Sequence, residues 1–151
     1  MSSSAKPKGK IKVRPMEPED IEGILAIDRK FAGGKRSVTY ADPRGDFMGG
    51  DVGLSCVAEV AGKTVGFVLG RLKDSPYGRS DIGWLQAIGV DPEYQHQGVG
   101  GKLVEAFIER CRSKGAKSVR TMVSWHDIPL LALLRTQGFS RGDVAEFQKM
   151  L

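Results

Sequence analysis

The feature that most constrains this fold is a glycine-rich loop between a strand-like segment and a helix-like segment. Residues 82–90 are apolar on both alternations, which is typical of a strand covered on both faces. Residues 95–101 are rich in glycine and glutamine, and an apolar stripe at helical spacing then runs from Val99 to Cys111. Gly115 is the expected end of that helix. The sequence therefore predicts a strand, loop and helix in direct succession.

Three glycines suit this loop to an anion. Gly98, Gly100 and Gly101 carry no side chain, so a phosphate oxygen can approach the backbone closely. The first N–H groups of a helix lack intrahelical acceptors, and the helix dipole places partial positive charge there. We expect a pyrophosphate at this position. The alternative is that the glycines only allow the helix to pack closely on the sheet.

Two common phosphate-binding patterns do not fit the loop. The dinucleotide pattern G-x-G-x-x-G is absent because the glycines fall at 98, 100 and 101. The triphosphate pattern G-x-x-x-x-G-K-[ST] is absent because Leu103 stands where its second glycine belongs. Both patterns usually follow the first strand of a parallel sheet, whereas this loop follows the fourth strand-like segment.

The remaining segments predict one mixed α/β domain over residues 11–151, preceded by a disordered basic tail over residues 1–10. We expect a mixed sheet in which antiparallel strands are followed by a βαβ crossover, with helices on both faces. The expected elements are a strand at 11–14, a helix from 18 to 31, a loop at 34–52, a hairpin of 54–60 and 64–70 with a turn at 61–63, a polar loop at 73–80, a strand at 119–123, a helix from 128 to 136 that Asp127 caps, and one or two closing strands within 139–151.

Composition excludes several classes of protein. The 151 residues are 40% hydrophobic and 27% charged, as in an ordinary globular domain. Lys6, Lys8 and Lys10 in the tail carry three of the five net positive charges, so we expect no basic nucleic-acid surface on the folded body. We see no membrane span and no secretory signal, and therefore expect a cytoplasmic protein. Cys56 and Cys111 lack metal-ligand spacing, so we expect structural thiols and no metal.

The pattern Gln95-x-x-Gly98-x-Gly100, preceded by Val-Asp-Pro-Glu-Tyr and opening a long helix, resembles the coenzyme A signature of the GNAT N-acetyltransferase superfamily. The resemblance covers residues 11–151 and includes Gly138-Phe139 after the last helix. It implies a GNAT-like α/β fold, with acetyl-CoA as the co-substrate. It also implies transfer of an acetyl or acyl group to an amine, for which we expect a primary amine. Because neither Cys56 nor Cys111 falls near the predicted cleft in the sequence, we expect a direct transfer in a ternary complex.

The resemblance also implies coenzyme-binding positions. The end of the fourth strand should offer backbone groups to the pantetheine arm, and the loop should surround the pyrophosphate with N–H groups. Lys102 is a candidate phosphate partner, although solvation alone is the alternative, and Asp127 stands where the family often has an asparagine. The expected set is Ile88, Gly89, Val90, Gln95, His96, Gln97, Gly98, Val99, Gly100, Gly101, Lys102 and Asp127.

Three positions where family members carry an acid or base are apolar here, namely Trp84, Met122 and Leu134. With Trp125, these residues fit either ordinary core or an apolar acceptor pocket. Catalysis then depends on positioning and oxyanion stabilisation, with water or another residue carrying protons.

The candidate proton carriers are His126, Asp81 and Tyr40, each also readable as a structural or solvated residue. The alternative function is a non-catalytic acyl-CoA-binding or regulatory module. Residues 28–50 and 73–80 should select an acceptor that the sequence does not identify. A homodimer remains open, because dimers are common in the superfamily.

Overall fold

A computed structural model describes residues 9–30, 54–75 and 78–151 of the chain. The candidate Tyr40 and most of the predicted acceptor loop therefore lie outside the described residues. The described elements are β1 (Ile11–Pro15), the 3-10 turn η1 (Pro18–Asp20), α1 (Ile21–Lys30), β2 (Cys56–Val60), β3 (Lys63–Ser75), β4 (Gly78–Val90), the 3-10 turn η3 (Pro92–Tyr94), α3 (Val99–Ser113), β5 (Ser118–Arg120) and α4 (Ile128–Thr136).

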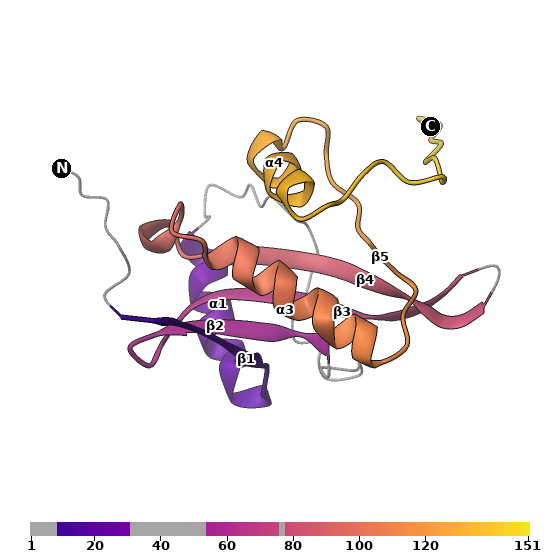
Figure 1. Ribbon diagram of the computed structural model, residues 1–151. Coiled ribbons are helices and arrows are strands. Elements are labelled where there is room, and N and C mark those ends of the chain that lie inside the picture. Colours follow the sequence, from indigo (N-terminus) through magenta and orange to yellow (C-terminus); the bar gives the residue numbers. More distant parts are fainter. Residues whose placement is uncertain (1–8, 31–53, 76–77) are drawn as a thin grey trace.

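The five described strands form one sheet in the order β1-β2-β3-β4-β5 (Figure 1). Neighbours from β1 to β4 are antiparallel, and β5 is parallel to β4. A parallel neighbour requires a crossover connection, and α3 supplies it. The predicted mixed sheet, with antiparallel strands before a βαβ crossover, is confirmed.

The sheet separates two apolar clusters, with α3 on one face and α1 on the other (Figure 1). Phe107 of α3 is fully buried on the first face, and a Cβ atom at Gly70 would lie 2.2 Å from its ring. Glycine at 70 therefore lets the aromatic ring lie directly on the strand. Ile24 and Ile27 of α1 are buried on the second face. Helices on both faces are thus confirmed, and the 3.6-residue apolar periodicity explains why each helix buries one stripe.

Two predicted loops are shorter than the sequence indicated. The β2–β3 turn is the two-residue pair Ala61 and Gly62, with φ of 51° and 79°, rather than residues 61–63. Residues 76 and 77 lie outside the described residues, but for the rest of 73–80 the predicted polar loop is wrong, because β3 continues to Ser75 and pairs with β4 at Gly78. Strand pairing satisfies backbone hydrogen bonds whatever the side chains are, so polar residues here mark an exposed hairpin arm.

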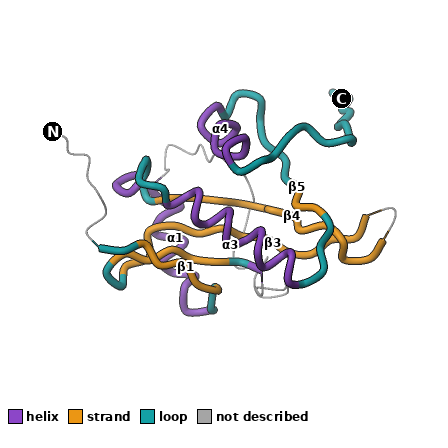
Figure 2. Tube along the Cα trace, in the orientation of Figure 1, coloured by secondary structure: helices purple, strands orange, loops and turns teal. Residues whose placement is uncertain are grey.

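The chain after α3 carries less regular structure than predicted. β5 ends at Arg120 instead of Val123. The closing strands expected within residues 139–151 are absent, and Figure 2 shows only loop after α4. β5 itself is only three residues long, so it offers a short edge for a further strand to pair with. The contacts of the C-terminal segment with the fold include the packing of Phe139 against the core cluster on the α3 face and an ion pair of Asp143 with Arg120 at 3.0 Å.

None of the helices in the described ranges is long and apolar enough to cross a membrane. Cys56 and Cys111 are free and buried, as expected for structural thiols. Burial raises the pKa of each thiol to about 11, so neither is an effective nucleophile near neutral pH.

Candidate functional site

The last three residues of β4 have one edge beside which the described residues form no strand. Residues 88–90 pair with residues 66–68 of β3 on one side. On the other side β5 pairs only as far as Trp84 with Arg120, so no strand of the described chain lies beside residues 88–90. Backbone N–H and C=O groups on such an edge can pair with an extended ligand, as in strand addition.

A β-bulge lies where β4 and β5 part. Leu69 pairs with Ala87 but Gly70 pairs with Leu85, so Gln86 is an extra residue in β4. Leu85 accordingly belongs to the cluster on the α3 face and Ala87 to the cluster on the α1 face. A bulge re-aims the backbone on one side of it. The hydroxyl of Thr121 donates a hydrogen bond to the Leu85 carbonyl at 2.8 Å, which ties the first residue after β5 to this point.

The loop between β4 and α3 has a defined backbone conformation. The Gln95 side-chain amide donates to the Val90 carbonyl at 3.1 Å, which folds the loop back on the strand end. His96 and Gly98 both have positive φ, at 64° and 88°, and α3 begins at Val99. Left-handed residues beside a helix N-terminus turn successive N–H groups toward one point, which makes a concave anion site.

The three loop glycines have different roles. A Cβ atom at Gly98 would meet nothing within 4 Å, so this glycine leaves open space at the helix N-terminus. A Cβ atom at Gly100 would lie 3.1 Å from Leu133, and one at Gly101 would lie 3.2 Å from Gln137. Those two glycines therefore let the last part of α4 lie close to α3. The anion interpretation fits Gly98, and the close-packing alternative fits Gly100 and Gly101, with α4 rather than the sheet as the neighbour.

Two predicted coenzyme residues carry buried oxygens without a hydrogen-bond donor among the described residues. Gln97 buries its amide oxygen in this way. Asp127 caps α4 by accepting from the Leu130 N–H at 3.2 Å, but its second carboxylate oxygen meets no donor in the described part of the chain. Buried acceptors are normally paired, so each oxygen is consistent with a ligand that brings N–H or O–H groups. Together with the open helix N-terminus at Gly98, which suits a phosphate, these acceptors fit a ligand that also carries N–H or O–H donors, such as amides.

The structure brings most of the predicted coenzyme residues to one end of the sheet. The end of β4, the loop and the first turn of α3, with its exposed Lys102, follow one another directly. The candidate Asp81 lies elsewhere, because Val90 is nine residue steps further along β4, or about 30 Å. Its carboxylate accepts from the Ser75 N–H at 3.1 Å and hydroxyl at 2.8 Å, which braces the β3–β4 hairpin.

The segment between β5 and α4 exposes several of the residues predicted near the acceptor. His126 is exposed, and its backbone N–H donates to the Ser124 hydroxyl at 3.1 Å. Met122 and Trp125 are 60% and 67% exposed, so their interpretation as ordinary core is wrong. Leu134 is buried as expected. Apolar side chains left open to solvent suit a binding surface better than a core.

Sequence reasoning missed an ion pair at the start of the loop. The Lys30 ammonium lies 2.7 Å from one carboxylate oxygen of Asp91 and 3.2 Å from Glu93. Burial raises the pKa of Asp91, but hydrogen bonds from Lys30 and from the Glu93 N–H outweigh it, and the net pKa lies below 3.8. Hydrogen bonds to Asp91 and Glu93 in turn raise the pKa of Lys30. Only the Asp-Pro pair after a strand hinted at a special role for Asp91.

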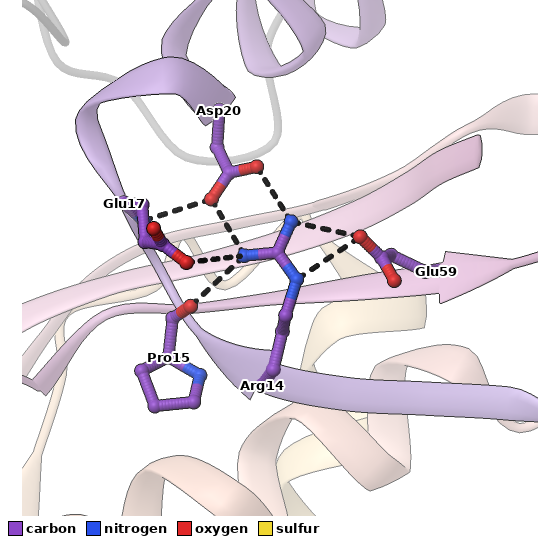
Figure 3. A network of polar contacts seen from close by, with 5 residues as sticks. All are labelled: Arg14, Pro15, Glu17, Asp20 and Glu59. Carbon is purple, nitrogen blue, oxygen red and sulfur yellow. Dashed lines mark hydrogen bonds and ion pairs between the residues drawn. The ribbon is translucent and has the colours of Figure 1, made fainter. Parts of the chain in front are cut away.

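A second charge cluster lies at the opposite end of α1 (Figure 3). The Arg14 guanidinium donates to both oxygens of Asp20 at 2.8 and 2.9 Å, and to Glu59 at 2.8 and 3.0 Å. The hydrogen bonds from Arg14 hold the pKa of Asp20 below 3.8, and they outweigh its desolvation. A bidentate pair of this kind joins β1, β2 and the turn before α1, which is a structural role.

Comparisons with known proteins all identify acetyltransferases. Residues 21–139 match the model of the acetyltransferase (GNAT) family. Over 91 residues, or 60% of this chain, the sequence is 30% identical to the mycothiol acetyltransferase of Arthrobacter sp. (strain FB24) and to the L-2,4-diaminobutyric acid acetyltransferase of Nocardia farcinica (strain IFM 10152). Those matches span only 28% and 45% of the two relatives, so the chain covers less than half the length of either.

One solved structure of similar shape is an aminoglycoside N-acetyltransferase, AAC(6')-Iy, in complex with CoA. The two chains superpose with a TM-score of 0.74 at 18% identity, over 97% of this chain and 99% of the other. At an identity this low, the superposition shows a shared fold alone. The fold prediction made from the sequence is thereby confirmed.

Proposed function

We propose that this chain, which belongs to the acetyltransferase (GNAT) family, transfers the acetyl group of acetyl-coenzyme A directly to a primary amine. The observation that carries the proposal is the open edge of β4 at residues 88–90, which leads directly into the loop and the N-terminus of α3. An extended amide arm and a pyrophosphate need these two features in this order.

In this proposal the backbone of Ile88, Gly89 and Val90 pairs with the pantetheine arm. The N–H groups from His96 to Gly101, Gln97 and Val99 included, surround the pyrophosphate, while Gln95 holds the loop against β4. Lys102 lies in the first turn of α3 and adds positive charge. Asp127 offers its free carboxylate oxygen to a ligand N–H or O–H group.

The chemistry needs a neutral amine, whereas a free alkylammonium has a pKa of about 10.4. The amine nitrogen forms a bond to the thioester carbon, the carbon–sulfur bond breaks, and the amine proton leaves as the thiolate departs. A backbone N–H group near Ile88 or Val90 stabilises the developing oxyanion. Because Trp84, Met122 and Leu134 are apolar, water or His126 carries the proton. A thiolate whose parent thiol has a pKa of about 8.5 needs little assistance to leave.

A two-part experiment tests this function. Isothermal titration calorimetry measures acetyl-CoA binding, and a thiol-release assay measures thioester loss with a panel of amines. Binding with amine-dependent thiol release is the expected result. Binding without release across a broad panel contradicts the enzyme and supports the alternative of a non-catalytic acyl-CoA-binding module.

The buried thiols support direct transfer without an acyl-enzyme. With Cys56 and Cys111 both replaced by Ala, turnover should persist in the folded fraction, because neither thiol has a lowered pKa. Circular dichroism provides the control for folding. A complete loss of turnover in a folded double variant contradicts direct transfer.

The proposed acceptor is a small-molecule primary amine. The names of the relatives support this class, since they include a diaminobutyric acid acetyltransferase and an aminoglycoside acetyltransferase. The panel should therefore contain L-2,4-diaminobutyrate, aminoglycosides and short peptides with free N-termini. Release with peptides alone contradicts the small-molecule class.

We further propose that residues 11–151 act as one cytoplasmic domain and associate as a homodimer. The two free cysteines suit a reducing compartment. Four apolar side chains of the C-terminal segment are between 82% and 114% exposed, which is typical of a contact surface, namely Val144, Phe147, Met150 and Leu151. Light scattering after size-exclusion chromatography should show a dimer that Phe147→Asp weakens, and a monomeric wild type contradicts it.

A further inference from the structure

We propose that the ion pair between Lys30 and Asp91 is a positioning contact that holds the coenzyme loop, residues 95–101, in its binding conformation. Lys30 is the last described residue of α1, which covers one face of the sheet, and Asp91 follows β4 directly. The loop opens α3, which covers the other face. The inference rests on the proposed function and extends it to a residue outside the site.

Asp91 is held from three directions, by two contacts of its carboxylate and one of its backbone N–H. Its residue is 1% exposed, and one carboxylate oxygen accepts from the Lys30 ammonium at 2.7 Å. The other oxygen accepts from the Glu93 N–H at 3.0 Å. Its own N–H donates to the Val65 carbonyl of β3 at 2.8 Å. Asp91 thus joins α1, β3 and η3 at one point.

The position of Asp91 is passed to the loop through short-range contacts. The Tyr94 N–H donates to the Asp91 carbonyl at 2.8 Å, which closes the turn η3. The next residue, Gln95, donates from its side chain to the Val90 carbonyl at 3.1 Å. Glu93, Tyr94 and Gln95, which lead to the left-handed residues His96 and Gly98, are therefore hydrogen-bonded to Asp91 or to its neighbour Val90.

A buried carboxylate depends on its cation. With the charge of Lys30 removed, Asp91 keeps one backbone donor and a more distant attraction to Lys63, whose charge also lowers the Asp91 pKa. A buried charge that loses its partner is strongly unfavourable, so the carboxylate should turn toward water and displace η3. The Glu93 carboxylate is 73% exposed, so its own contact with Lys30 contributes little.

Two physical mechanisms give opposite results at Asp91. If the cluster acts only through its electric field, Asp91→Asn removes a negative charge near the phosphates and acetyl-CoA binds more tightly. If the ion pair positions the loop, Asp91→Asn weakens binding although the protein becomes more positive. Asparagine can still accept from the Glu93 N–H but cannot form the ion pair with Lys30.

The experiment compares full-length variants by calorimetry with acetyl-CoA at fixed ionic strength and by thermal unfolding. Lys30→Met and Asp91→Asn should each raise the Kd about tenfold. The Kd of the double variant should not exceed the higher of the two single-variant values, because both substitutions remove the same contact. Lys30→Arg keeps the charge and should bind within about threefold of wild type. In turnover assays the KM for acetyl-CoA should rise more than kcat falls.

Arg14→Met is the matched control, since it removes the cation at the other end of α1. It should lower the unfolding temperature and leave the Kd within about twofold of wild type. Kd values within twofold for both Lys30→Met and Asp91→Asn, or tighter binding by Asp91→Asn, overturn the inference. Wild-type protein that binds no acetyl-CoA overturns the proposed function itself, and with it this inference. Should Lys30→Met not fold, Lys30→Gln replaces it under the same criteria.

Discussion

Helix α1 is tied to the sheet by an ion-pair cluster at each end, and the two clusters are built differently. The Arg14 cluster, made of Arg14, Asp20 and Glu59, lies at its start, and the Lys30 cluster, made of Lys30, Asp91 and Glu93, lies at its end. Each centres on a buried aspartate beside a 3-10 turn, with exposures of 8% and 1%. The basic partners differ in geometry and therefore in what they can do.

A guanidinium can bind two carboxylates at once in a planar arrangement, and Arg14 does so across two strands and a turn (Figure 3). A lysine ammonium is a point charge on a flexible stem, and Lys30 meets one buried and one exposed carboxylate. The Arg14 cluster therefore acts on stability. The Lys30 cluster, next to the coenzyme loop, acts on the geometry of binding. Both clusters can be separated experimentally, because about 15 Å of helix lies between them.

The largest expected effect is on stability at the Arg14 cluster. Arg14→Met leaves the buried Asp20 without its cation, and the unfolding free energy should fall by about 2 kcal/mol, the low side for a partly exposed pair. Differential scanning calorimetry should show a fall in Tm of about 6 °C. Arg14→Lys keeps the charge but not the planar guanidinium, so its Tm should lie between those of wild type and Arg14→Met. An unchanged Tm contradicts the structural role.

The contribution of the Arg14 cluster to stability should also depend on pH in the acid range. The pKa of Asp20 is lowered in the fold, so its stabilisation is present above the usual value near 3.8 and is lost as the pH falls through the folded pKa. The unfolding free energy of wild type, measured with urea, should therefore fall steadily below about pH 4. The unfolding free energy of Arg14→Met should fall less over that range, because Asp20 no longer has a favoured charged form. Parallel curves for the two proteins contradict this assignment.

A matched pair of glycines sharpens the comparison at the coenzyme end. Gly98 and Gly62 have φ of 88° and 79°, and a Cβ atom at either would meet nothing within 4 Å. Replacement by Ala should cost about 1 kcal/mol of stability at each position because of the left-handed backbone. Only Gly98→Ala should also weaken acetyl-CoA binding, by about fivefold or more, since its methyl group enters the predicted phosphate space. Equal Kd values for both variants contradict the anion site.

The smallest effect is expected at the exposed member of the Lys30 cluster. Glu93→Gln removes the carboxylate that is 73% exposed and keeps the 2.7 Å contact of Lys30 with Asp91. The Kd for acetyl-CoA should stay within about twofold of wild type, and the Tm within about 1 °C. Calorimetry and thermal unfolding measure both quantities. A Kd change as large as that of Asp91→Asn means that Glu93, rather than Asp91, is the partner that matters to Lys30.

Much of the fold was predictable from the sequence because its signals are local. The apolar spacing from Val99 to Cys111 predicts α3, and Asp127 with Gly138 correctly bounds α4. Polarity misled at residues 73–75 and 78–80, where paired strands replace the predicted loop, since a strand can have solvent on its side chains. Residues 139–151 carry strand-like apolar character but no strand, because pairing requires an edge that the sequence does not reveal.

The site was half predictable for the same physical reason. The sequence alone determined a strand, an Asp-Pro turn and a glycine loop at a helix start, because bond geometry, side-chain period and backbone conformation act over a few residues. Tertiary structure decided that Gly98 faces open space while Gly100 and Gly101 face α4, and that β5 leaves the edge of residues 88–90 free. It also joined Lys30 to Asp91 across 61 residues of chain. Packing sets such contacts, and no local pattern records which distant residue will stand opposite.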